Sequence, residues 1–332
     1  MKTIAVDPSW DGRRLTRFLQ KTLPAASIGQ IARFLRLGRI KVDGRRGRED
    51  TVLAAGQQVE LYVEDEWFAA PAREDPFYGK IRPKLTILYE DVNVMLLDKR
   101  PGLICHPDEG EKVHTLLTYA QAYLYQKGEW QPGQGFAPAL CNRIDRFTGG
   151  IVILAKNAEA LRIMDAKLRG REVEKYYLCA VHGKMKYPEG TLRHALLKRP
   201  EQKKVSVVKP GEPGSREAIT HYRVVDEANG LTLCECLLGT GRTHQIRAQF
   251  AHIGHPLLGD NQYGRAQLNE RYGRVSGQAL CAYRLIFSFE TDAGCLSGLD
   301  GLCVQVADVP FVRTYFPDVV IPDPMTEEGQ RT

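Results

Sequence analysis

The segment Cys141–Gly150 reads C-N-R-I-D-R-F-T-G-G and leads directly into the apolar run Ile151–Leu154. The apolar run predicts a buried strand, and the two glycines before it predict a tight turn without Cβ atoms. Asp145 therefore belongs to a loop beside a rigid element, where catalytic groups are often held. Arg143 and Arg146 flank this carboxylate and favour its ionised form. An isolated Arg-x-Asp-Arg is more often a surface ion-pair cluster, so the alternatives are distinguished by other motifs.

The bulk composition favours a soluble protein with more than one domain. The chain has 332 residues, which is long for a single hydrophobic core. Hydrophobic residues make up 43% and charged residues 26% of it, as in ordinary globular proteins. No apolar run reaches the roughly eighteen residues of a membrane span, and the N-terminus has no signal-peptide pattern. We therefore expect the protein to stay in the cytoplasm.

The cysteine pattern argues against a disulfide framework. The chain has eight cysteines, scattered and mostly within apolar, strand-like runs, and it contains no C-x-x-C pair. Reduced, buried thiols are the better interpretation. A zinc site from His252, His255 and cysteines is the alternative, but no second ligand pair has the spacing of zinc sites. We therefore predict no metal site.

Residues 1–66 predict a small basic α+β domain. Amphipathic helices are expected at 12–24 and 28–37, the second capped by Ser27, and strands are expected at 38–44 and 58–63. Between positions 11 and 48 the chain has nine Arg and two Lys but only two Asp. A surface of that charge density is typical of phosphate binding. The alternative is a generic small domain with a solvated charged face.

This N-terminal segment resembles the small RNA-binding domain with an αL motif that occurs in ribosomal protein S-four and many RNA-modifying enzymes. Its helix start at 14–19 and the stretch R-L-G-R-I-K-V-D-G at 36–44 carry the resemblance. The resemblance implies that Arg14, Arg36, Arg39 and Lys41 contact RNA, mainly through its backbone and shape.

Residues 67–84 are predicted to be an interdomain linker, because acidic residues and prolines occur there without periodicity. Residues 85–325 are predicted to form the second domain. Its expected elements are a hairpin at 85–97, helices at 112–126, 158–169 and from about Thr243, and strands at 151–154, 173–181, 217–225 and 231–238. Strands interrupted by single helices, without regular βαβ alternation, indicate an α+β fold on a mixed or antiparallel sheet.

Three further motifs accompany Asp145 in this second domain. They are K-Y-Y-L-C-A-V at 175–181, G-T-G-R-T-H-Q-I-R at 239–247 and H-I-G-H-P-L-L-G-D at 252–260. Taken singly, each has an ordinary structural explanation: Tyr177 fits core packing, and the G-x-G fits a plain turn. The G-x-G is not a dinucleotide fingerprint, because His244 occupies the position of the third glycine.

Together, in this order, the motifs resemble the RluA family of pseudouridine synthases. The family's H-R-L-D-x-x-T-S-G appears as N-R-I-D-R-F-T-G-G at 142–150, and its K-x-Y-x-A appears as K-Y-Y-L-C at 175–179. T-G-R-T-H-Q-I-R is intact at 240–247, G-H-P-L-L-G-D is intact at 254–260, and N-K-P-x-G-L appears as D-K-R-P-G-L at 98–103. The resemblance covers about residues 84–290, and its layout is most similar to the RluC-type members. Asn142 and Gly149 depart from the family pattern and put base-eviction contacts and local rigidity in question, but not Asp145.

The resemblance implies an isomerase that breaks the N-glycosidic bond of a uridine in RNA and rejoins the base through carbon 5. No redox step or group transfer occurs, so neither a cofactor nor a metal is expected. Asp145 is implied as the catalytic carboxylate, attacking either the sugar or the base. Arg247 is implied to pair with it, as a guanidinium suits. Tyr177 is implied to stack on the flipped uracil and to relay a proton.

Further cations are implied to contact the RNA. Arg143 would occupy the place of the flipped nucleotide and offset the cost of flipping, which is a few kcal/mol. The others are Arg146, Arg242, His244 and Lys99. The expected substrate is 23S ribosomal RNA and the expected state is a monomer. A transfer-RNA synthase and a non-catalytic RNA-binding or ribosome-assembly protein remain the alternatives, and the tail after residue 290 has no functional interpretation.

Overall fold

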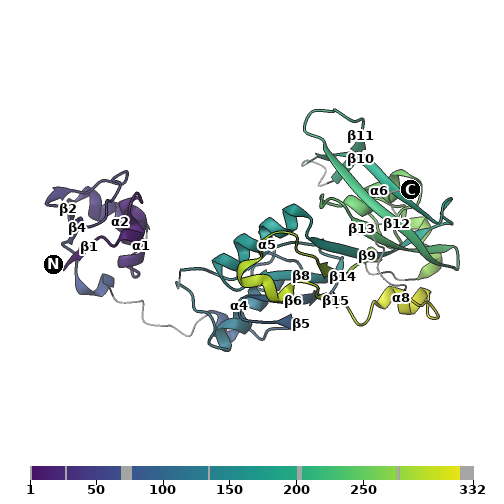
Figure 1. Ribbon diagram of the computed structural model, residues 1–332, viewed down its shortest axis with the longest axis horizontal. Coiled ribbons are helices and arrows are strands. Elements are labelled where there is room, and N and C mark those ends of the chain that lie inside the picture. Colours follow the sequence, from purple (N-terminus) through teal and green to yellow (C-terminus); the bar gives the residue numbers. More distant parts are fainter. Residues whose placement is uncertain are drawn as a thin grey trace. The chain divides into compact units, whose positions relative to one another are not determined.

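The computed structural model describes residues 2–26, 28–68, 77–133, 135–199, 204–273, 275 and 277–321. The chain divides into two compact units, Met1–Lys80 and Ile81–Thr332 (Figure 1). The division falls within the segment expected to be a linker, although Trp67 and Phe68 pack against the core of the first unit. Ser27, the expected helix cap, and residues 69–76 of that segment lie outside the described residues.

The described residues of the first unit form a four-stranded sheet, two longer helices and the four-residue helix α3 (Phe77–Lys80) at its end. Its elements are β1 (Lys2–Ala5), α1 (Leu15–Thr22), α2 (Ile28–Arg36), β2 (Ile40–Val42), β3 (Arg45–Arg46) and β4 (Gln58–Leu61), and the strand order is β1-β4-β2-β3. Helix α1 begins three residues later than predicted, because Arg14 is extended and bridges Val52. The Asp-Gly turn is confirmed: Asp43 and Gly44 have φ values of 48° and 75° and join β2 to β3.

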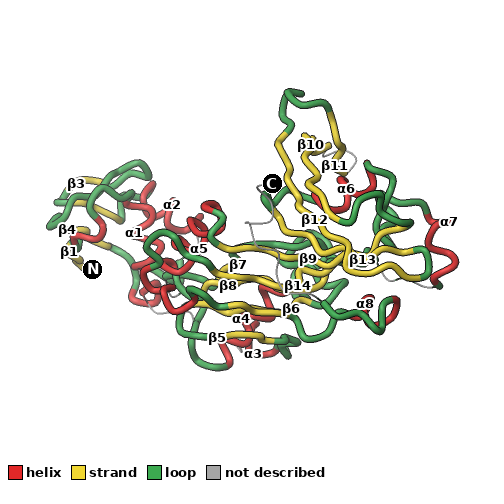
Figure 2. The backbone as a smooth tube through the Cα atoms, turned by 45° about the vertical axis from the view of Figure 1, so that its right-hand side comes forward, coloured by secondary structure: helices red, strands yellow, loops and turns green. Residues whose placement is uncertain are grey.

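The second unit is built on one mixed sheet, which confirms the predicted α+β class (Figure 2). Its strands are β5 (Ile87–Glu90), β6 (Val94–Lys99), β7 (Ala139–Leu140), β8 (Gly149–Ala155), β9 (Val173–His182), β10 (Glu189–Arg199), β11 (Lys204–Val208), β12 (Arg216–Ala228), β13 (Leu231–Leu238), β14 (Leu280–Phe287) and β15 (Cys303–Gln305). The order is β11-β10-β12-β13-β9-β14-β8-β6-β5, with β7 on β8 and β15 on β14. The β5–β6 hairpin is as predicted.

Strands β10, β11 and β14 were not among the predicted elements. Strand β10 is mostly polar and turns only a few apolar side chains inward, so the alternation of apolar and polar residues along it is weak. Strand β14 is a short apolar run that is buried along nearly its whole length, and such a run fits a buried helix as well as a strand. It nevertheless occupies the centre of the sheet, between β9 and β8.

The pair Gly149–Gly150 corrects another prediction. These residues belong to β8 itself, not to a turn before it, and they pair in parallel with Cys281 and Ala282 of β14. Gly150 has φ of 105°, and a Cβ atom there would lie 2.1 Å from the carbonyl oxygen of Ala282. The glycine thus permits the close approach that joins the two halves of the sheet.

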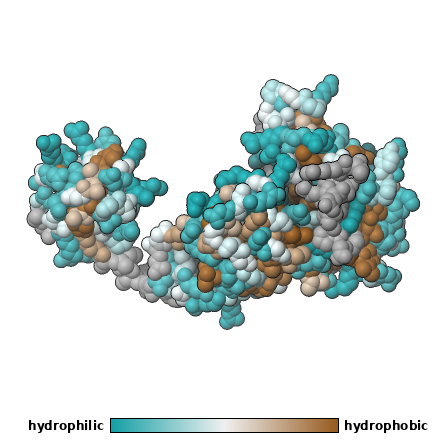
Figure 3. Space-filling view, in the orientation of Figure 1, coloured by the Kyte–Doolittle hydropathy of each residue, from teal (hydrophilic) through white to brown (hydrophobic). Residues whose placement is uncertain are grey.

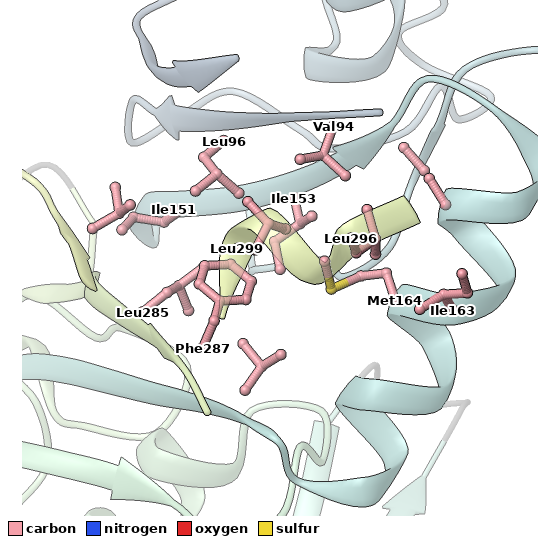
Figure 4. Packing of buried hydrophobic residues seen from close by; sticks show 14 of the residues in the cluster. Val94, Leu96, Ile151, Ile153, Ile163, Met164, Leu285, Phe287, Leu296 and Leu299 are labelled. Carbon is pink, nitrogen blue, oxygen red and sulfur yellow. The ribbon is translucent and has the colours of Figure 1, made fainter. Parts of the chain in front are cut away.

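The helices of the second unit are α4 (Leu116–Gln126), α5 (Ala158–Gly170), α6 (Gln245–His252), α7 (Ala266–Asn269) and α8 (Pro310–Tyr315). Helix α5 covers β6, β8 and β14, with Met164 buried among Ile153 and Phe287 (Figure 4). The C-terminal tail completes this core, because Leu296 and Leu299 are buried in it. Among the described residues, no helix is both long and apolar enough to cross a membrane.

Candidate active site

Asp145 lies in the loop 141–148 between β7 and β8, as the sequence predicts. Its side chain is 26% exposed, so the carboxylate is accessible without being fully solvated. The Asn142 side chain holds the start of the loop, because its Oδ1 accepts a hydrogen bond from the Ile153 N–H of β8 at 2.8 Å. A Cβ on Gly149 would come within 3.3 Å of the Pro101 ring, so a larger residue there requires a small shift of that ring. Asn142, the other departure from the family motif, has a structural role in this chain.

Arg247 reaches Asp145 from helix α6. Its Nη1 donates to Asp145 Oδ2 at 2.9 Å, although the two residues are 102 positions apart in the chain. Its Nε and Nη2 donate to the two oxygens of Asp260, at 2.6 and 3.0 Å. Burial alone would lower the pKa of Arg247, but the hydrogen bonds and charges of Asp260 and Asp145 outweigh it and raise the pKa. The guanidinium is therefore a fixed positive charge aimed at Asp145.

Tyr263 and His244 support this arrangement from the side. The Arg247 guanidinium carbon lies 5.0 Å from the centre of the Tyr263 ring. The Tyr263 hydroxyl is 2.9 Å from His244 Nδ1 and accepts a hydrogen bond from the Val205 N–H of β11 at 2.8 Å. His244 Nε2 lies 3.6 Å from Asp145 Oδ2. Burial lowers the pKa of His244 even though Asp145 opposes that shift, so the imidazole is mainly neutral at physiological pH.

Tyr177 of β9 lines the same cavity as Asp145 and Arg247. This active-site cavity has a volume of about 410 Å³ and is also bordered by Arg143, Arg242 and His244. Burial raises the pKa of the Tyr177 phenol, and the charge of Asp145 raises it further, so the phenol stays protonated. The acid, the guanidinium and the aromatic ring expected from the sequence are thus brought to one cavity.

The position of Lys99 argues against the RNA contact predicted for it. Its side chain is completely buried, and its Nζ donates to the carbonyls of Leu103 and Arg146 at 2.8 and 3.0 Å, and to that of Arg100 at 3.2 Å. Burial lowers its pKa to about 8. Lys99 therefore ties the 99–103 turn to the loop that holds Asp145.

The other arginines of this unit that are predicted to contact RNA differ in whether they line the active-site cavity. Arg143 and Arg242 are exposed and line the cavity, although Arg242 Nε also donates to the Glu217 carbonyl at 3.0 Å. Arg146 is exposed but does not line it, because its Nε donates to the Gly102 carbonyl at 3.2 Å.

The predicted contacts of the first unit lie on its surface. Arg14, Arg36 and Arg39 are exposed, and Lys41 is half-buried with its Nζ 5.1 Å from the centre of the Tyr62 ring. Arg39 also lies 3.5 Å from Glu64 in an exposed ion pair. The visible face of this unit is largely hydrophilic in Figure 3.

The described residues give no support to a zinc site. They contain no group of three or more His, Cys, Asp or Glu side chains placed to hold a metal ion. His252 instead packs edge-on against His194, with 5.0 Å between ring centres, and His255 Nδ1 is 2.9 Å from the His182 carbonyl. All eight cysteines are free, and five of them are buried.

Sequence reasoning missed two residues of this site. Asp260 is the last residue of the G-H-P-L-L-G-D motif, which by itself predicts no role for it, yet it is 1% exposed and holds Arg247 with both oxygens. Tyr263 follows three positions later. An acid directly after an apolar, glycine-containing stretch was a usable signal for Asp260, whereas nothing local indicated Tyr263.

Comparison with known proteins identifies the same region. Residues 93–252 match the profile of a family described as RNA pseudouridylate synthase. The ribosomal large subunit pseudouridine synthase D of Xanthomonas campestris is 31% identical over 271 residues, which is 80% of this chain and 76% of that protein. The synthase D of Pseudomonas aeruginosa is 33% identical over 264 residues, covering 76% and 74%. An uncharacterised RNA pseudouridine synthase of Aquifex aeolicus is 33% identical over 259 residues, covering 76% and 77%.

Solved structures share the fold. The human RNA Pseudouridylate Synthase Domain Containing 1 has a TM-score of 0.54 with this chain at 20% identity, and the match covers 75% of this chain and 93% of that one. Domain Containing 4 of the same human series has a TM-score of 0.53, also at 20% identity, over 68% and 89%.

Proposed function

Because the chain belongs to the RNA pseudouridylate synthase family, we propose that Asp145 is the carboxylate with which it isomerises uridine in RNA to pseudouridine. The observation that carries this proposal is the 2.9 Å hydrogen bond from Arg247 to Asp145 at the edge of the cavity that Tyr177 lines. A carboxylate so placed is aimed by a cation and accessible, as a nucleophile has to be.

The roles of the other groups follow from their chemistry. The reaction breaks the bond between uracil N1 and the ribose, turns the base and forms a bond from carbon 5 to the ribose. Carbon 5 then loses its proton and N1 gains one, so the product is an isomer of the substrate. The buried phenol of Tyr177 offers a flat, apolar face to the detached base. Because burial keeps it protonated, it acts in proton transfer by giving one proton as it takes another. Asp260 holds Arg247 in place while Asp145 changes its charge.

Arg143 is proposed to replace the flipped nucleotide in the RNA. It is exposed, borders the cavity and lies two residues before Asp145. A guanidinium plane is well suited to stack on the neighbouring bases. Its contacts offset part of the cost of flipping, which is a few kcal/mol.

Large-subunit ribosomal RNA is the proposed substrate, and the cytoplasm and a monomeric state belong to the same proposal. The support is that relatives from Xanthomonas and Pseudomonas carry large-subunit names. Both relatives are named synthase D, so the similarity of the motif layout to the RluC-type members stays a prediction. A non-catalytic RNA-binding protein is disfavoured, because a pure binder gains nothing from a carboxylate held beside the negatively charged backbone of RNA.

The test is to map pseudouridine in ribosomal and transfer RNA from cells that lack the gene and carry it back on a plasmid. The unchanged gene should restore the missing modification, whereas Asp145→Asn should fold normally and restore none. Asp308→Asn is the matched control, because that carboxylate is 52% exposed and pairs with Arg313 instead of lining the cavity. Modification restored by Asp145→Asn would overturn the role of Asp145, and sites confined to transfer RNA would overturn the ribosomal substrate.

A further inference from the structure

A second cavity adjoins the active-site cavity and is strongly basic. It has a volume of about 450 Å³ and shares Lys175, Gly241 and Arg242 with the first. Arg169 and Arg171, at the end of helix α5, also line it. We call it the basic cavity. Its lining carries four cations against one carboxylate, that of Asp165.

Lys175 is the innermost of these cations. It lies on β9 two positions before Tyr177, and alternate residues of a strand face the same side. Its side chain is half-buried, and among the described residues its ammonium has neither a hydrogen-bond acceptor nor an ion-pair partner. Burial lowers its pKa, and the charge of Arg171 lowers it further. A cation taken out of water without a partner is unfavourable unless an anion joins it.

Arg171 occupies an unusual backbone position. It is the C-cap of α5 and has φ of 64° and ψ of 23°, the left-handed conformation in which glycine is the usual residue. A long side chain there costs free energy, and such positions often have a functional reason. The attraction of cations to a helix C-terminus accounts for Arg169. It does not account for an arginine in the left-handed conformation, or for Lys175 on a neighbouring strand.

We propose that the basic cavity binds a phosphodiester group of the RNA strand, adjacent to the nucleotide held in the active-site cavity. The inference rests on the proposed function, because it needs a flipped nucleotide over Tyr177. Two strand positions span about 7 Å, so Lys175 lies roughly one nucleotide step from that base. Gly241 lines both cavities, and the space beside it is open, since a Cβ there would meet no atom within 4 Å. Guanidinium and ammonium groups are the side chains that bind phosphate oxygens.

Two variants test the proposal. One removes a positive charge from the basic cavity, and the other removes its negative charge. Arg171→Gly takes away a cation and puts the favoured residue at a left-handed position, so its melting temperature should equal or exceed that of the unchanged protein. Its affinity for a stem-loop RNA containing the mapped uridine should fall by about fivefold, and the slope of log K against log salt should become shallower by about 0.7–0.9. Asp165→Asn should have the opposite effect and strengthen binding.

The control is Lys184→Gln, which removes an exposed lysine that pairs with Glu227 and lines neither cavity. It should leave the affinity within about twofold and the slope within about 0.3 of the unchanged values, since rim charges far from a phosphate matter little. Equal salt slopes for Arg171→Gly and the unchanged protein, or weaker binding by Asp165→Asn, would overturn the proposal.

A substituted RNA assigns the contact to the backbone. A neutral methylphosphonate linkage is placed in turn on either side of the target uridine. At one of these positions it should weaken binding to the unchanged protein but not to Arg171→Gly, because the same contact is already lost. Equal effects on both proteins at both positions would overturn the assignment. Failure of this proposal is separable from failure of the Asp145 role, because that role is tested by whether Asp145→Asn restores modification in cells and not by the RNA affinity of Arg171→Gly.

Discussion

At the scale of single residues, the site combines one accessible carboxylate with buried groups that hold its partner. Asp145 is accessible, whereas Asp260, which makes two hydrogen bonds to the same guanidinium, is buried. Because Asp260 neutralises Arg247, the buried guanidinium keeps a partner even when Asp145 is engaged with substrate. Lys99 acts similarly on the backbone, through three carbonyl oxygens around the loop of Asp145.

The buried lysine predicts a dependence of stability on pH. The pKa of Lys99 is lowered from 10.5 to about 8 in the folded protein. Between these values the unfolded chain keeps a proton that the folded chain has lost, so the free energy of unfolding rises with pH. Relative to Lys99→Met, the unchanged protein should gain about 2 kcal/mol between pH 7.5 and 10. Urea unfolding at both pH values measures this, and a difference that does not change with pH would contradict it.

At the scale of elements, the sheet has one seam where β8 runs parallel to β14. Every other strand pair found in the described residues is antiparallel. The seam lies directly after the loop that holds Asp145. The packing of β8 against β14 therefore also fixes the position of that loop. Tyr177 pairs with Ala282 on the other side of β14. One strand thus positions both the acid and the aromatic ring.

Gly150→Ala should break this seam. The added methyl would lie 2.1 Å from the Ala282 oxygen, at a φ of 105° that alanine avoids. Because both obstacles are backbone, we expect a loss of more than about 4 kcal/mol in the free energy of unfolding, or no folding. Gly298→Ala is the control: it has open space around its Cβ and should change stability by less than about 0.5 kcal/mol. A Gly150→Ala protein with a normal denaturation midpoint would refute the role given to the seam.

At the scale of the whole molecule, the chain joins a compact unit rich in exposed arginine to a unit that contains the candidate chemistry. Exposed cations act on RNA over a screening length of about 10 Å at moderate salt, and they raise affinity without selecting a base. From this charge distribution we expect the first unit to contribute mainly to RNA binding and the second to the reaction.

The triple variant Arg36→Gln, Arg39→Gln and Lys41→Gln tests that division in the full chain. We expect weaker RNA binding and a salt slope shallower by about 2 to 3, with an unchanged single-turnover rate at saturating RNA. Filter binding at several salt concentrations and rapid-quench kinetics measure the two effects. Lys2→Gln serves as the control, because Lys2 lies outside the arginine-rich stretch 11–48 and pairs with Asp65 at 3.4 Å. A slower reaction with an unchanged salt slope would reverse the assignment.

The sequence by itself determined the α+β class, the loop that carries Asp145 and the set of side chains with suitable chemistry. These follow from local periodicity and from short motifs, which need no knowledge of distant contacts. Local patterns also located α5 and β9 closely, since both have strong apolar periodicity bounded by polar residues. The outlying β10 and β11 lacked such a signal.

Only the tertiary structure decided what each charged group does. Lys99 and Arg143 look alike as cations near a motif, yet one is buried against carbonyl oxygens and the other is exposed at the cavity. Asp260 lies only 13 positions after Arg247, yet no local periodicity pairs the two side chains. Gly150 contacts Ala282 of a strand far along the chain. The physical reason is that burial and electrostatic pairing depend on neighbours in space, which the order of residues along the chain does not specify.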